Sequence, residues 1–179
     1  MSIFAIGDLH LSLGVSKPMD IFEGWQDYHI RLQNNWQRVV KPEDTVIVCG
    51  DISWALDIKD AVEDFKFIEN LNGNKIILKG NHDYWWSSKA KISAYLEEKG
   101  FSSIRFLQND AILAQEKILC GSRGWMCEDK MTAQDEKILQ REAIRFRMSL
   151  EAGVKLREET EREKGFRPEI ICFSHYPVI

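Results

Sequence analysis

Residues 45–51 read TVIVCGD, a run of apolar and β-branched residues that ends in glycine and aspartate. Such an uninterrupted run predicts a strand over Thr45–Cys49 in a sheet that is covered on both faces. Similar runs predict further strands, and longer amphipathic stretches separate several of them. These strands are expected at Ser2–Ile6, Lys75–Leu78, Ser103–Phe106, Lys117–Cys120 and Glu169–Phe173. The alternation of strands and helices indicates an α/β fold.

Apolar residues at spacings of three and four predict the helices. The expected helical segments are Trp25–Val39, Ile58–Ile68 and Ser87–Lys99. Residues from about 132 to 164 are expected to form one long helix or two shorter ones. We expect a single domain over residues 1–179, with this helical segment as an insertion.

Composition excludes several classes of protein. The chain is 44% hydrophobic and 29% charged, which is typical of a globular protein rather than a disordered one. Its formal charge is −4, which argues against long nucleic acid as a partner. No apolar run approaches the roughly 20 residues that span a bilayer, and the first residues do not resemble a signal peptide. We therefore expect a cytoplasmic protein without a membrane partner; the sequence does not identify a protein partner.

Four of the predicted strands lead directly into polar segments. These segments are Gly7-Asp8-Leu9-His10, Gly50-Asp51, Gly80-Asn81-His82-Asp83 and Ser174-His175-Tyr176-Pro177. Ligands of open α/β sheets bind at the carboxyl ends of the strands, so these side chains are expected along one rim. A single Gly-Asp pair is ordinary turn chemistry, but the whole set of carboxylate, imidazole and amide donors suits Mn, Fe or Zn. A carboxylate on a central strand, here Asp51, could bridge two such ions about 4 Å apart.

The ordered series GDLH, GD, GNHD and HYP resembles the calcineurin-like metallophosphoesterase superfamily, and the resemblance spans nearly the whole chain. It implies a four-layer α/β/β/α sandwich of two mixed sheets. It also implies two divalent metal ions, Mn, Fe or Zn. By this resemblance, Asp8, His10 and Asp51 hold the first ion. The second ion is held by Asp51, Asn81 and His175.

The resemblance further implies a dinuclear phosphohydrolase, either a phosphatase or a phosphodiesterase, in which a metal-bridging hydroxide attacks a phosphomonoester or phosphodiester. His82 then stabilises the phosphoryl group or protonates the leaving oxygen, and Asp83 either orients that imidazole or caps the following helix. Asn81 and Arg123 are the candidate substrate-binding residues. Arg123 follows a predicted strand and is flanked by glycines; it either reaches a phosphate bidentately or is an ordinary exposed loop arginine. A small phosphoester is the expected substrate.

The chain departs from the family pattern in two places. Many members carry an Asp three residues after the bridging Asp, where it orients the catalytic histidine. Trp54 stands there instead, which leaves Asp57 and Asp83 as candidates for that role. The family's terminal GHxH motif does not occur before Ile179, so we expect an incomplete member that lacks the last strands and has weakened activity. The alternative is a catalytically impaired or non-catalytic interaction module with the same fold, although the intact ligand set favours the enzyme.

Tryptophans cluster beside the strand-end segments. They form either an aromatic wall around the metal site or a plug at the rim of the core, and burial is the commoner fate of large aromatic residues. The four in question are Trp54, Trp85, Trp86 and Trp125.

Overall fold

The apolar run that begins at residue 45 forms an inner strand of a parallel sheet. In the computed structural model, which describes residues 1–128 and 130–177, β2 (Thr45–Cys49) pairs with β1 (Ile3–Ile6) and with β3 (Asn74–Leu78). A short strand, β4 (Ile104–Phe106), pairs with β3 and completes the order β1-β2-β3-β4. All three pairings are parallel, so the carboxyl ends of these strands lie along one edge of the sheet.

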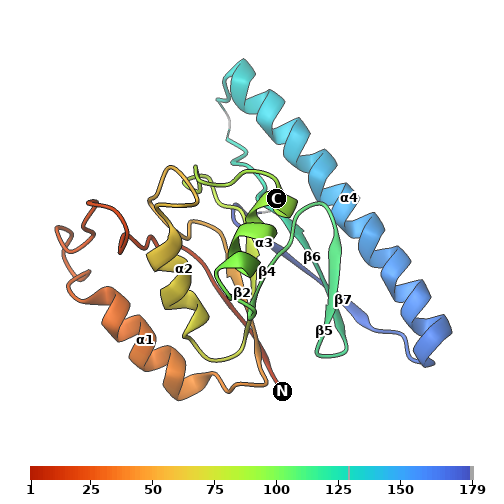
Figure 1. The fold of residues 1–179 in the computed structure, drawn as a ribbon. Coiled ribbons are helices and arrows are strands. Elements are labelled where there is room, and N and C mark those ends of the chain that lie inside the picture. Colours follow the sequence, from red (N-terminus) through yellow and green to blue (C-terminus); the bar gives the residue numbers. More distant parts are fainter. Residues whose placement is uncertain (129, 178–179) are drawn as a thin grey trace. The chain divides into compact units, whose positions relative to one another are not determined.

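Helices connect successive strands of this sheet. They are α1 (Tyr28–Val39), α2 (Val62–Glu69) and α3 (Lys89–Glu98) (Figure 1). α1 and α3 lie within their predicted segments, and α2 ends one residue beyond its own. α1 begins after Asp27, whose φ of 50° is left-handed and does not continue a right-handed helix. Side chains from helices and strands share one apolar core, which includes Trp36, Val48, Phe65, Ile77 and Leu96.

A second sheet contains a strand that the sequence did not reveal. β6 (Lys117–Ser122) is its centre; it pairs in parallel with β7 (Glu169–Ser174) and antiparallel with β5 (Ala111–Ala114). β5 and β6 are joined by Gln115 and Glu116, with φ of 52° and 59°. A two-residue turn with both φ positive favours Asn-Gly or Asp-Gly, so the residues found here carried no hairpin signal.

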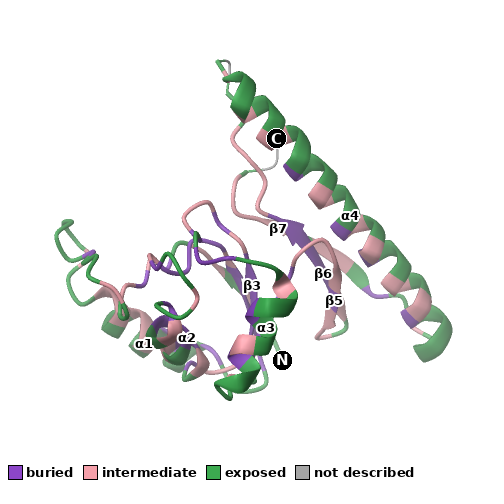
Figure 2. Cartoon of the chain, turned by 45° about the horizontal axis from the view of Figure 1, so that its top comes forward, coloured by how far each residue is buried: buried purple, intermediate pink, exposed green. Residues whose placement is uncertain are grey.

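The segment predicted as one or two helices is a single helix, α4 (Ala133–Lys164). It starts with a capping box between Thr132 and Asp135 and ends at Gly165, whose φ of 72° is left-handed. Where α4 packs on its sheet, a Cβ added at Gly153 would overlap the Cys120 sulfur. Glycine therefore permits the close approach, and much of the helix surface remains exposed (Figure 2).

The chain groups into two compact units, Met1–Phe106 and Leu107–Ile179, each built around one of these sheets. Two sheets and four helices in the described residues confirm the prediction of an α/β fold. The second sheet is mixed as expected, but the expectation of two mixed sheets is wrong for the first, whose pairings are all parallel. Within residues 1–128 and 130–177, no helix is both long enough and apolar enough to cross a membrane.

Candidate metal centre

Backbone pairing continues past the ends of β1 and β2 and brings three of the predicted metal ligands together. The amide of Asp8 donates to the Gly50 carbonyl over 3.0 Å, and the amide of His10 donates to the Asp51 carbonyl over 2.9 Å. The His10 Nε2 atom consequently lies 3.5 Å from Asp8 Oδ1 and 3.8 Å from Asp51 Oδ2. Between these polar side chains, Leu9 is buried in the core, so the segment alternates between core and site.

The same three residues share an uncommon backbone conformation. Asp8, His10 and Asp51 have φ values of 56°, 45° and 54°, in the left-handed region that L-residues seldom adopt. Each such residue costs about 1–2 kcal/mol, which contacts in the surrounding structure must offset. Backbone strain of this kind gathers at functional sites, which independently marks these two loops.

The loop after β3 contributes His82 and Asn81. The His82 amide donates to Asp51 Oδ1 over 2.9 Å, and the His82 ring lies 5.9 Å from the His10 ring. Asn81 is half-buried in the same turn. A Cβ added at Gly80 would overlap both the amide and the carboxylate of Asp51, so only glycine permits this approach of the two loops.

Asp83 lies beneath the site rather than at its surface. Its carboxylate is fully buried; Oδ2 accepts the amides of Asp51 (2.9 Å) and Gly80 (2.7 Å), while Oδ1 accepts the amide of Ile52 (2.8 Å) and the indole N–H of Trp85 (3.1 Å). Burial raises the pKa of Asp83, and the hydrogen bonds from backbone amides oppose that shift. Asp83 therefore ties the β3 loop to the β2 loop that carries Asp51.

Two further residues support the same loops, and the sequence reading missed both. Asp64 of α2 is fully buried; it accepts the Ser53 hydroxyl and, over 2.7 Å, the Leu13 amide. In the sequence, Asp64 could have been noticed as an acidic residue on the apolar face of a predicted helix. The Tyr28 hydroxyl donates a hydrogen bond to the His10 carbonyl over 2.7 Å. Burial raises the pKa of Tyr28 to about 12, so the hydroxyl stays protonated and keeps this hydrogen bond.

The tryptophans divide between core and site. Trp85 and Trp86 are 3% and 8% exposed and belong to the core, as burial statistics predicted. Trp54 is half-buried, and its ring stacks on His10 with centroids 4.8 Å apart. Of these three tryptophans, Trp54 therefore lies at the site, whereas Trp85 and Trp86 lie in the core.

Arg123, Trp125 and His175 belong to the second unit. The Arg123 carbonyl, which follows β6, accepts the His175 amide over 3.2 Å, so these two residues are neighbours at the carboxyl ends of parallel strands. The Arg123 guanidinium donates to Glu142 Oε1 over 3.0 Å and lies 4.8 Å from the Trp125 ring centroid. Glu142 is only 2% exposed, which makes Arg123 part of a largely buried ion pair.

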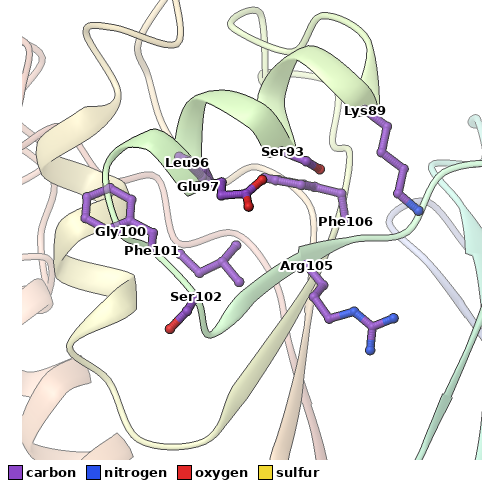
Figure 3. A pocket seen from close by; sticks show the side chains of 10 residues that line it. Lys89, Ser93, Leu96, Glu97, Gly100, Phe101, Ser102, Arg105 and Phe106 are labelled. Carbon is purple, nitrogen blue, oxygen red and sulfur yellow. The ribbon is translucent and has the colours of Figure 1, made fainter.

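A cavity of about 470 Å³ in the first unit lies away from these loops. It lies between α3 and β4, and its lining includes Lys89, Phe101 and Arg105 (Figure 3). None of the sequence-predicted site residues is among its lining residues.

The donor set at the strand ends fits a divalent metal ion. Asp8 and Asp51 each present a carboxylate oxygen within 4.8 Å of the other, and His10 adds an imidazole nitrogen to the pair. Two carboxylates and one imidazole are the ligands that Mn, Fe and Zn accept in proteins.

The chain resembles a known protein family and several solved structures. Calcineurin-like phosphoesterases match the chain over residues 1–179. Among solved structures, a protein of unknown function from Aquifex aeolicus is 21% identical, with a TM-score of 0.47 over 97% of this chain and 90% of that chain. A phosphopantetheinyl hydrolase from Mycobacterium tuberculosis is 13% identical, with a TM-score of 0.43 over 98% of this chain and 68% of that chain. No curated protein matches. Because the family match covers the whole chain, the chain belongs to the calcineurin-like phosphoesterases, a family of metal-dependent phosphoester hydrolases.

Proposed function

We propose that the chain is a dinuclear metal-dependent phosphohydrolase that cleaves a small phosphomonoester or phosphodiester. The observation that carries this proposal is the cluster of Asp8, His10 and Asp51, formed by two neighbouring strand ends. Family membership supplies the class of reaction.

The proposed ligands follow the family resemblance residue by residue. Asp8, His10 and Asp51 would hold one ion, and Asp51, Asn81 and His175 would hold the second. Bound divalent ions would lower the pKa of water toward about 7 and neutralise charge on the phosphoryl oxygens. The same proposal includes Mn, Fe or Zn as the metals, a cytoplasmic location, and a single four-layer domain with α4 inserted in it.

His82 is the proposed proton donor. Hydrolysis breaks the bond between phosphorus and the leaving oxygen, and that oxygen needs a proton at neutral pH. A protonated His82 imidazole can supply it, as a general acid worth about 10²- to 10⁴-fold in rate. Its backbone amide donates to Asp51 Oδ1 and its ring lies 5.9 Å from the His10 ring, which supports a role for His82 at the proposed site.

Asp83 and Arg123 have narrower roles in the proposal. Because its carboxylate is buried under loop amides, Asp83 acts through the position of Asp51 rather than on the substrate. Arg123 is kept as a candidate phosphate contact, although its guanidinium already pairs with Glu142. Asn81 is proposed to contact the substrate as well as the second ion.

The test compares His82→Ala with His29→Ala, a half-buried histidine of α1 that serves as the control. With p-nitrophenyl phosphate and bis(p-nitrophenyl) phosphate as probes, His82→Ala should keep its manganese and lose about 10²- to 10⁴-fold in kcat. A larger loss with phenyl phosphate, a poorer leaving group, would identify proton donation rather than phosphoryl binding. Wild-type rates in His82→Ala would contradict the mechanism, and no hydrolysis by metal-loaded wild type would favour an interaction module.

A further inference from the structure

Trp54 contacts both site histidines of the first unit. Its ring stacks on His10, with centroids 4.8 Å apart and planes 19° apart, and it lies 4.7 Å from the His82 ring at a tilt of 54°. The two carboxylates considered for an orienting role are engaged elsewhere. Asp57 is exposed and accepts the Lys59 amide, while Asp83 accepts loop amides.

Trp54 is itself held from several directions. Its indole N–H donates to the Met19 sulfur over 3.1 Å, and its backbone amide donates to the Leu11 carbonyl over 2.9 Å. The Lys17 ammonium lies 3.2 Å from the ring centroid, in the geometry of a cation–π contact. These contacts fix the indole before any ligand binds, so the ring is a rigid surface for its neighbours.

We propose that Trp54 is a positioning residue that orients the imidazoles of His10 and His82. A ring stacked on His10 restricts rotation of the imidazole about its Cβ–Cγ bond and keeps Nε2 directed at Asp8 and Asp51. The inference builds on the proposed function, because it assigns the orientation of that site's ligand and proton donor.

The first experiment needs neither metal nor substrate. Imidazole ¹H–¹³C spectra of the full-length metal-free protein, at one pH, would be compared for wild type, Trp54→Leu, Trp54→Phe and Trp36→Leu. The Trp54 ring current should shift the His10 and His82 signals in wild type. Trp54→Leu should abolish that shift, and Trp54→Phe should retain part of it. Trp36→Leu removes a buried tryptophan of α1 and should leave both signals unchanged, as a control for general loosening.

The second experiment measures manganese affinity by calorimetry and then kcat and KM for bis(p-nitrophenyl) phosphate. Loss of a residue that orients a ligand typically costs about 10- to 100-fold in metal affinity or activity, and we expect this of Trp54→Leu. The loss should appear in kcat with KM unchanged, and Trp54→Phe should restore most of it.

Unchanged imidazole signals in folded Trp54→Leu, or wild-type manganese affinity and kcat with only KM raised, would overturn the proposal and make Trp54 a substrate contact. If the leucine variant does not fold, Trp54→Phe decides: partly retained shifts with manganese affinity near that of wild type support ring positioning, and loss of both contradicts it. An inactive wild type that still shows the shifts and the affinity change would refute the proposed function alone.

Discussion

Replacement of Asp83 by asparagine tests whether a buried carboxylate holds the two metal-site loops together. Oδ2 accepts the amides of Asp51 and Gly80, and Oδ1 accepts the amide of Ile52 and the indole N–H of Trp85. Asparagine has nearly the same shape but offers one oxygen and one NH₂ group. Oδ1 also accepts the Ser53 amide over 3.4 Å, so at least two N–H donors face an NH₂ group whichever way the asparagine amide is turned.

The cost follows from those lost bonds. A hydrogen bond to a charged group contributes about 1.5–3 kcal/mol, so two of them amount to at least about 3 kcal/mol. Asparagine also removes a buried charge, and this relief keeps the expected loss near the lower limit. We therefore expect Asp83→Asn to lower the free energy of unfolding by about 3 kcal/mol.

Urea unfolding followed by tryptophan fluorescence measures this loss, since Trp85 is one of the partners. The matched control is Asp57→Asn, an exposed carboxylate that accepts a single amide, from Lys59; it should change stability by less than about 0.5 kcal/mol. Asp83→Asn should also reduce kcat, because Asp51 loses its support. A change of less than about 0.5 kcal/mol in Asp83→Asn would refute the reasoning.

Further predictions concern a buried lysine, a glycine and an arginine. Burial lowers the pKa of Lys75 to about 8, so the unfolded chain binds its proton more tightly. The unfolding free energy of wild type should therefore rise by about 2 kcal/mol from pH 7 to pH 9.5 relative to Lys75→Met, and parallel urea-melt pH profiles would contradict this. Gly80→Ala would push a methyl group into Asp51, so it should lower the free energy of unfolding by about 1–3 kcal/mol and weaken manganese binding. The control is Gly7→Ala, whose methyl group meets only an ordinary 3.6 Å contact. Calorimetry that finds the same stability and manganese affinity in both variants would argue against the close approach of the two loops. Arg123→Ala should raise KM for p-nitrophenyl phosphate about tenfold if its guanidinium binds phosphate, with Arg145→Ala as control, and an unchanged KM would remove Arg123 from the site.

Strong local signals made most of the fold predictable. The run over Thr45–Cys49 and the helical stripes mark the first sheet and its helices, because apolar periodicity reports burial directly. β5 escaped because a strand of only four residues is too short to show a clear period, and because Gln115 and Glu116 form a turn without a turn signature. The division into two compact units leaves no mark in composition.

The clustering of Asp8, His10 and Asp51 was predictable from the sequence, but the contacts that hold their loops in place were not. Motifs that follow apolar runs place Asp8, His10 and Asp51 at strand ends, but the sequence does not reveal that all three adopt left-handed backbone conformations. Asp83 was read as a candidate for catalysis because it adjoins His82. Its contacts include the amides of Asp51 and Ile52, about 30 residues away, and such long-range hydrogen bonds have no local signature.

The central claim is that the strand ends bind two divalent ions through a shared Asp51. The most direct measurement is the number of manganese ions bound per chain after dialysis, for wild type beside Asp51→Asn. The account predicts about two ions in wild type and loss of both in the variant, because both sites share that carboxylate. Two ions retained by Asp51→Asn, or none bound by wild type, would contradict it.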